Sequence, residues 1–179
     1  MSDEQPALSP AEISSLGRGE ILITSRPEPG SPLPRVTIKA VIEAPTSRVW
    51  PLIDDVGNYH KNLAGIKRAR ELSRDGEKAM VEATIGVPFP LKDMTSTSES
   101  LHQELGDGRY RRSWKMVHGD YKANSGSWDL LPFEGDPNRT LLIYQVFAVP
   151  KMRIPKKLQE MAQKSAGPKM VELLRKQAR

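Results

Sequence analysis

The regular spacing of turn signals across the middle of this chain constrains its fold more than any other feature. Between residues 67 and 149, groups of Gly, Pro, Asp and Asn separate short segments that are typical of β-strands. The turn signals are Asp75-Gly76, Pro88-Phe89-Pro90, Gly106-Asp107-Gly108, His118-Gly119-Asp120 and Glu134-Gly135-Asp136-Pro137-Asn138. They delimit six expected strands, roughly Lys67 to Arg74, Glu77 to Val87, Lys92 to Leu105, Arg109 to Val117, Tyr121 to Pro132 and Thr140 to Val149. Strands joined by short turns pair antiparallel, so this section predicts a meander.

The first part of the chain predicts a short helix and two strands. Ser9, followed by Pro10 and by Glu12, has the composition of a capping box, and the helix should end near Gly17. The segment from Glu20 to Ser25 predicts a strand, and the proline-rich connection after it cannot continue a ladder. Apolar residues alternate again from Arg35 to Glu43, which predicts a second strand.

Two short helices should follow this strand. Thr46 is the expected N-cap of the first of them, and Pro51 should distort its second turn, because proline lacks the backbone N–H that the helix needs. The second helical piece should run from Tyr59 to Ala64. We therefore expect both helices to lie between the first core strand and the meander.

The last long element is a helix from Pro155 to Ala178, with apolar residues at helical spacing. Gly167-Pro168 should kink or split this helix. An antiparallel sheet with helices on one side must bury that face against them, and only this helix is large enough to fill it. The sequence thus predicts an α+β domain with space for a small ligand between sheet and helix.

The positive charge of the chain is concentrated at its C-terminal end. The 27 Lys and Arg residues exceed the 22 Asp and Glu residues by five. Residues 151–179 hold nine of the basic and two of the acidic residues, so this segment carries +7 and the first 150 residues carry −2. The segment is either a solvated helix face or a surface that meets an anionic membrane. Nucleic-acid binding is not expected, since no recognition motif occurs and the basic segment contains no aromatic residue.

Several classes of protein are excluded by what the sequence lacks. It has no cysteine, which removes disulfide frameworks, thiolate metal sites and cysteine nucleophiles. Its three histidines, His60, His102 and His118, are too scattered for a local metal motif, so neither a metal nor a cofactor is expected. Residues 124–127 lack the first glycine of a nucleophile elbow, and a serine hydrolase is unsupported. No run of apolar residues suits a signal peptide or a membrane span, which predicts a cytoplasmic protein, with peripheral membrane contact left open.

Short sequence motifs in a fixed order carry a resemblance to a known family. They are Val41-Ile42-Glu43-Ala44-Pro45 with Val49-Trp50, Asp54-Asp55 with Tyr59, Gly126-Ser127-Trp128-Asp129-Leu130, Thr140-Leu141-Leu142-Ile143-Tyr144, and Val149-Pro150 with Ile154-Pro155. The chain resembles the START-like superfamily of polyketide cyclases/dehydrases and lipid-transport proteins, which includes coenzyme-Q-binding proteins. The resemblance covers about residues 35 to 178. It leaves residues 1–34 as a leader before a ligand-binding domain of residues 35–179, and Pro51 departs from the usual first helix.

The resemblance implies a helix-grip fold, in which a curved antiparallel sheet of about seven strands wraps around the long C-terminal helix. It also implies a cavity between sheet and helix, although members of the family carry hydrophobic ligands, cyclise or dehydrate polyketides, or bind hormones. The residues that we expect to contact a ligand there are Trp50, Tyr59, Met94, Trp114, Met116, Trp128, Gln145, Phe147, Leu158 and Met161. For Trp114 and Met116 an ordinary core position is the default interpretation, and in a hollow domain it overlaps with ligand contact.

Three functions remain open on the sequence alone. The first is binding or transport of a hydrophobic small molecule of the lipid, isoprenoid or polyketide type. The second is an enzyme of the aromatase/cyclase or dehydratase type, with Arg112, His118 and Tyr144 as acid–base candidates; a solvated His118 beside its turn is the alternative interpretation. The third is a membrane-surface adaptor acting through the basic C-terminal helix. The ligand and the oligomeric state are not determined by the sequence.

Overall fold

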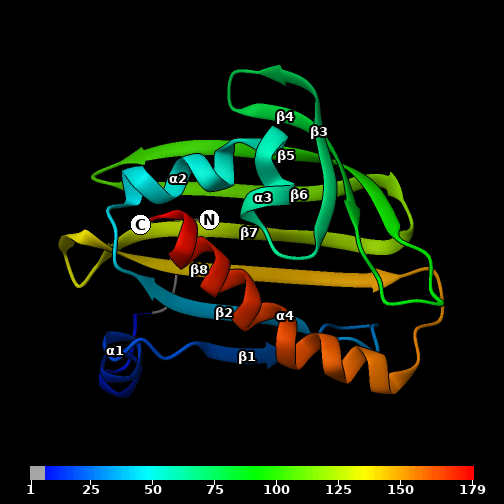
Figure 1. The fold of residues 1–179 in the computed structure, drawn as a ribbon, viewed down its shortest axis with the longest axis horizontal. Helices are drawn as coiled ribbons and strands as arrows, with labels where there is room; N and C mark the ends of the chain where they lie inside the picture. Colours follow the sequence, from blue (N-terminus) through cyan, green and yellow to red (C-terminus); the bar gives the residue numbers. More distant parts are fainter. Residues whose placement is uncertain (1–6) are drawn as a thin grey trace.

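The computed structural model describes residues 7–179, except for the side chains of residues 163 and 164. Its eight strands form one antiparallel sheet in the order β1-β2-β8-β7-β6-β5-β4-β3 (Figure 1). The strands are β1 Leu22–Arg26, β2 Arg35–Ile42, β3 Ile66–Asp75, β4 Lys78–Ile85, β5 Met94–Gly106, β6 Arg109–Gly119, β7 Tyr121–Phe133 and β8 Asp136–Pro150. The predicted meander is confirmed, because β3 to β8 are consecutive neighbours. β1, which lies within the segment expected to be a leader (residues 1–34), adds a strand to the predicted sheet and pairs with β2 at its edge.

Turn residues set the ends of the hairpins where the sequence indicated them. The turn between β5 and β6 has positive φ at Gly106, Asp107 and Gly108, a conformation that glycine adopts without steric cost. The last turn is tighter than expected, since Phe133 already pairs with Asp136 and β8 begins before the Asp-Pro-Asn signal ends. Long strands result, and β7 and β8 cross the whole domain.

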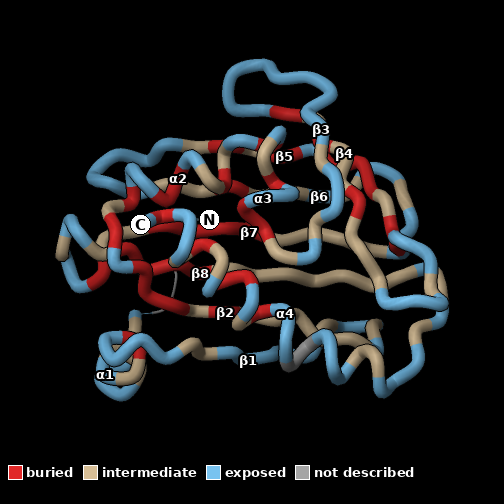
Figure 2. The backbone as a smooth tube through the Cα atoms, viewed as in Figure 1, coloured by how far each residue is buried: buried red, intermediate tan, exposed pale blue. Residues whose placement is uncertain are grey.

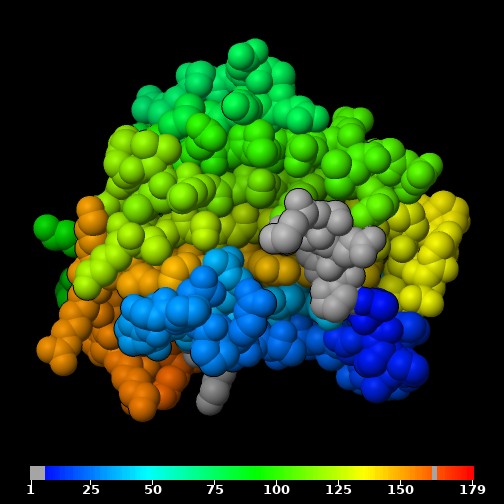
Figure 3. All heavy atoms as spheres, turned by 180° about the vertical axis from the view of Figure 1, so that it is seen from behind, coloured from blue at the N-terminus to red at the C-terminus, as the bar shows by residue number. Residues whose placement is uncertain are grey.

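The helices gather mainly on one face of the sheet (Figure 1). They are α1 Pro10–Gly17, α2 Thr46–Asp54, the 3-10 turn η1 Val56–Asn58, α3 Tyr59–Asn62 and α4 Lys156–Gln177. α2 contacts β6, β7 and β8, while α4 contacts β2, α2 and α3. Seen from behind (Figure 3), the opposite face shows residues of β5–β7 in its upper part, β1 and the loop after it below them, and α1 at one lower corner. None of the described helices is long and apolar enough to span a membrane.

Two apolar clusters hold these layers together. The larger one joins β2, β7 and β8 to α2 and to the C-terminal half of α4, where Val171 and Leu174 are fully buried. The smaller one lies on the other face and packs Leu16 of α1 against β2 and β8. Buried residues accordingly gather at the centre of the sheet and at the end of α4, whereas the first half of α4 is mostly exposed (Figure 2). The C-terminal half of α4 therefore anchors the helix.

The capping box of α1 is present as predicted: Glu12 N–H donates to Ser9 Oγ, and Glu12 Oε2 accepts from Ser9 N–H. The N-cap predicted for α2 is wrong. Pro45 occupies the cap position without a side-chain hydrogen bond, and Thr46 is the first helical residue. Pro45 has an extended backbone and takes the cap position, so the helix begins at Thr46, one residue earlier than a threonine cap would place it.

α4 runs unbroken through Gly167 and Pro168, so the helix is not split. Gly167 instead permits close packing, since a Cβ at this position would lie 2.7 Å from Ile38 Cδ1 of β2. Because Gly167 has no side chain, the middle of α4 packs directly against β2. The N-terminal half then extends along the domain toward the end of β8 (Figure 1).

Candidate functional site

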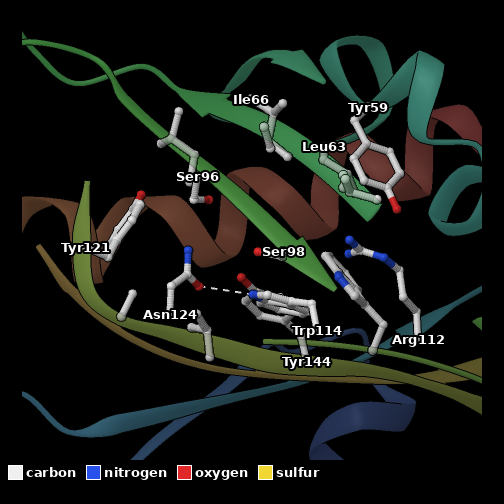
Figure 4. Close-up of a pocket in the computed structure, with 16 residues that line it drawn as sticks. Tyr59, Leu63, Ile66, Ser96, Ser98, Arg112, Trp114, Tyr121, Asn124 and Tyr144 are labelled. Carbon is white, nitrogen blue, oxygen red and sulfur yellow. Dashed lines mark hydrogen bonds between the residues drawn. The ribbon is translucent and has the colours of Figure 1, made fainter. Parts of the chain in front are cut away.

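An inner cavity of about 120 Å³ lies between the sheet and the short helix α3 (Figure 4). Its floor is aromatic and comes from β6, β7 and β8, namely Trp114, Trp128 and Tyr144. Ser96 and Ser98 of β5 form one wall. Arg112 and Tyr59 lie at one end, and Tyr121 and Asn124 lie at the other. The cavity is thus apolar along its length and polar at its ends.

The aromatic floor is held rigidly. The ring centroids of Trp128 and Tyr144 are 4.3 Å apart, and those of Trp114 and Tyr144 are 6.0 Å apart. Trp114 Nε1 donates to Asn124 Oδ1 at 3.0 Å. Gly126 pairs with Trp114 across the two strands, and a Cβ there would lie 2.5 Å from the indole ring. Only glycine lets the indole lie this close to β7.

Arg112 is the exceptional residue of the inner cavity. Its side chain is buried at 6% exposure, and its Nε has no hydrogen-bond partner among the described residues. Within that part of the chain no carboxylate pairs with it either. The guanidinium carbon lies 5.1 Å from the Tyr59 ring centroid and 5.3 Å from that of Trp114, so cation–π contacts replace an ion pair. Such contacts offset only part of the cost of taking a cation out of water.

The two phenols nearest Arg112 remain protonated at neutral pH. Burial raises the pKa of Tyr59 to about 12, and its hydroxyl donates to the Ile53 carbonyl at 2.6 Å. Burial also raises the pKa of Tyr144 above its ordinary value, and the charge of Arg112 opposes this shift. Tyr144 is therefore a neutral donor at the cavity wall and a poor acid or base at neutral pH.

An outer hollow of about 590 Å³ adjoins the inner cavity, and both are lined by Ile85 and Ala148. It lies between the N-terminal half of α4, which contributes Leu158 and Met161, and the loop joining β4 to β5. Met94 also lines it. Its walls are mostly apolar and its volume is in the range of small-molecule sites.

The structure distributes the residues predicted for the site unevenly. Tyr59, Arg112, Trp114, Trp128 and Tyr144 line the inner cavity, and Met94, Leu158 and Met161 line the outer hollow. The other predicted residues line neither space: Trp50, Met116, His118, Gln145 and Phe147.

Each displacement has a local cause. Trp50 stacks on Tyr110 at 5.1 Å between centroids. Phe147 lies on the other face of β8, under the guanidinium of Arg35 at 5.4 Å, and the alternation of a strand puts Gln145 on that face as well. His118 is exposed, because a β-bulge between its pair and that of Met116 ends the alternation that runs from Tyr110 to Trp114.

A hydrogen-bonded chain beside the cavity was not predicted. His102 Nδ1 lies 2.9 Å from Asp54 Oδ1, and its Nε2 lies 3.0 Å from Ser100 Oγ. Because the ionised Asp54 can only accept, Nδ1 carries the proton and Ser100 donates to Nε2. Burial, then the charges of Arg112 and Arg74, lower the pKa of His102 to about 4, although the hydrogen bond that His102 donates to Asp54 acts in the opposite direction.

The three hydrogen-bonded side chains resemble a nucleophile–base–carboxylate triad. However, Ser100 is 1% exposed and is not among the residues that line the cavity. A substrate in the cavity has no contact with its hydroxyl. The hydrogen-bonded side chains of Asp54, His102 and Ser100 therefore belong to the packed core beside Arg112. Within the described residues, no group of three His, Cys, Asp or Glu side chains is arranged to hold a metal ion.

Comparison with known proteins places the fold. The chain matches the family model described as polyketide cyclase / dehydrase and lipid transport over residues 42–175. A search of curated protein sequences finds no match. Among solved structures, a STAR-related lipid transfer protein from Xanthomonas axonopodis aligns with a TM-score of 0.75 at 18% identity, covering 88% of this chain and 93% of that one.

Two further solved structures show the same fold. Human StAR-related lipid transfer protein 5 aligns with a TM-score of 0.78 at 12% identity, over 90% of this chain and 83% of that one. The Zhui aromatase/cyclase from Streptomyces sp. R1128 aligns with a TM-score of 0.61 at 16% identity, over 80% of this chain and 90% of that one. At these identities the likeness concerns the fold alone.

A curved antiparallel sheet that grips a C-terminal helix over an apolar cavity defines a START-like helix-grip protein. The match over most of its length shows that this chain belongs to the polyketide cyclase / dehydrase and lipid transport family. It is a domain of the hydrophobic-ligand-binding, lipid-transfer or polyketide-cyclase type.

Proposed function

We propose that this protein binds or carries a hydrophobic small molecule of the lipid, isoprenoid or polyketide class, and that an anionic end of this molecule pairs with Arg112. The observation that carries the proposal is the buried guanidinium without a carboxylate partner among the described residues. An uncompensated buried charge costs several kcal/mol. A ligand carboxylate or phosphate would supply both the missing charge and the missing acceptor for Nε.

The volumes favour one orientation of the ligand. The inner cavity of about 120 Å³ suits a head group, whereas the adjoining hollow of about 590 Å³ suits an apolar body. The anionic end therefore enters first, and the apolar part lies against Leu158 and Met161 of α4. Ser96, Ser98 and Asn124 provide hydrogen-bonding groups for oxygen atoms further along the ligand.

Extraction of bound molecules tests this proposal. The full chain is purified from cells, weighed by native mass spectrometry and extracted with organic solvent. The wild type should release an acidic apolar molecule, Arg112→Leu should release little or none, and the exposed variant His118→Ala should match the wild type. The proposal fails if the wild type carries nothing and takes up no added fatty acid, or if Arg112→Leu carries the same molecule in the same amount.

The cyclase or dehydratase hypothesis now concerns Arg112 and Tyr144, since His118 lies apart from the cavity. A phenol with a raised pKa can donate a hydrogen bond to a ligand carbonyl but transfers a proton poorly at neutral pH. Binding is therefore the better supported function. Turnover of a polyketide-like substrate that Tyr144→Phe abolishes while binding persists would instead establish the enzyme.

We also propose that residues 151–179 bring the outer hollow to an anionic membrane. The observation in favour is Phe89, which is 95% exposed and follows Pro88, a residue that lines the hollow. An aromatic side chain at that rim can enter the lipid interface. Vesicle sedimentation should show binding that weakens steeply with salt, and binding that salt leaves unchanged would exclude an electrostatic contact.

A further inference from the structure

A third hollow, of about 600 Å³, opens beside the outer hollow where β8 leads into α4. Four basic side chains line it, namely Lys122 of β7, Lys151, Arg153, and Lys156 at the start of α4. No acidic residue lines it. We call it the basic hollow. Four cations around one concavity produce a positive potential that a single anionic group can meet from several sides.

These four cations are free to take a ligand. Within the part of the chain that the structure describes, none of them forms an ion pair, whereas other basic residues do, such as Lys39 with Glu12. All four are exposed, so their charges are hydrated and not neutralised by the fold. The nearby carboxylate of Asp120 accepts from the Thr95 N–H at 2.8 Å and forms no ion pair with any of the four cations. Glu160 is the only acidic residue between positions 151 and 171.

The basic hollow is continuous with the apolar route into the protein. Leu33, Pro150, Ile154 and Gln159 line both the basic hollow and the outer hollow. The β4–β5 loop that carries Phe89 borders the outer hollow from the other side, next to the start of α4 (Figure 1). The basic hollow and the β4–β5 loop with its exposed Phe89 therefore border the outer hollow on two sides.

We propose that the basic hollow binds the phosphate group of an anionic phospholipid while the mouth of the outer hollow rests on the bilayer. Phosphate suits the site because several donors from Lys and Arg can share its oxygens. A bilayer is favoured over an acidic protein partner because large apolar side chains are exposed near the outer hollow. Met161, 56% exposed, lines this hollow, and Phe89, 95% exposed, directly follows Pro88, which also lines it. The inference rests on the proposed membrane contact and not on the role of Arg112.

Matched pairs of lysine variants distinguish a phosphate site from diffuse attraction. Lys122→Gln with Lys156→Gln removes two charges from the hollow, and Lys157→Gln with Lys176→Gln removes two exposed charges outside it. Sedimentation with phosphatidylcholine vesicles containing phosphatidylglycerol measures the affinity of each full-length variant. The hollow pair should weaken binding at least about tenfold more than the control pair, since hydrogen bonds to charged groups are lost only there. Equal losses in the two pairs would overturn the proposal.

Two further arms identify the source of the phosphate. Phe89→Ser should weaken vesicle binding, and inorganic phosphate alone should bind more weakly than the vesicles by calorimetry. If inorganic phosphate binds as tightly as the vesicles, or if an acidic carrier protein binds where vesicles do not, the bilayer assignment is wrong. The hollow pair should still release the same extracted ligand as the wild type, and Arg112→Leu should still sediment with vesicles. Failure of this inference is thereby separated from failure of the proposed ligand site.

Discussion

Acid should destabilise this protein through one buried histidine. His102 is held neutral between Asp54 and Ser100, and burial lowers its pKa from 6.5 to about 4. The unfolded chain therefore takes up this proton at a higher pH than the folded chain does. Stability is unaffected above about pH 6.5, falls as the pH drops toward 4, and falls no further from this group below that. Each unit of pKa difference corresponds to about 1.4 kcal/mol, so about 3 kcal/mol should be lost.

Urea unfolding at several pH values between about 7 and 4 measures this loss. Glu12 and Asp93 add a loss of their own near pH 4, because their pKa values in the folded protein lie below the ordinary 4.5 and 3.8. The contribution of His102 is therefore the difference between the wild type and a variant that lacks this imidazole. His102→Gln should lose clearly less stability than the wild type between about pH 6.5 and 4, and the exposed variant His118→Gln should retain the wild-type slope. A wild type whose free energy of unfolding is constant from pH 6.5 to 4, or a His102→Gln variant with the wild-type slope, would refute the reasoning.

The remaining predictions concern packing. Gly126→Ala should destabilise the fold by about 1–3 kcal/mol and shift the tryptophan fluorescence, because its Cβ would clash with the Gln145 carbonyl and lie 2.5 Å from the indole of Trp114. Gly57→Ala, whose nearest contact is 3.5 Å, should be tolerated, and equal losses would contradict the packing described. In α4, Leu174→Ala should cost about 2–5 kcal/mol in chemical denaturation, whereas Met161→Ala should change little. A larger loss for Met161→Ala would mean that the N-terminal half of the helix is the anchored part.

Much of the fold is local in origin and was predictable for that reason. The capping box of α1 and the Gly-rich turns act within a few residues, so their elements appear where the sequence indicated. The alternation of a strand places Arg112 and Trp114 on one face of β6, and both line the cavity as predicted for each of them. The prediction for His118 failed because it depends on two strands. The bulge near His118 arises from how β5 pairs with β6, and no residue beside His118 indicates it.

The site depended more heavily on contacts between distant segments. The hydrogen bond between Asp54 and His102 joins residues 48 positions apart, so no spacing rule finds it. Trp50 was expected to contact the ligand, yet it stacks on Tyr110 in the core, 60 positions further along the chain. Ser96 and Ser98 of β5 line the cavity although they are not among the residues predicted for the site, because hydroxyl side chains are equally common on solvated strands.

A matched pair of ligands tests the central claim most directly. Calorimetry with lauric acid and with its methyl ester compares two molecules with the same chain, of which only the first carries a charge. The wild type should bind the acid at least about tenfold more tightly than the ester, in keeping with the value of a charge-assisted hydrogen bond, and Arg112→Leu should lose this preference. Equal affinities for acid and ester in the wild type, or an undiminished preference in Arg112→Leu, would contradict the assignment of Arg112 as the anchor of the ligand.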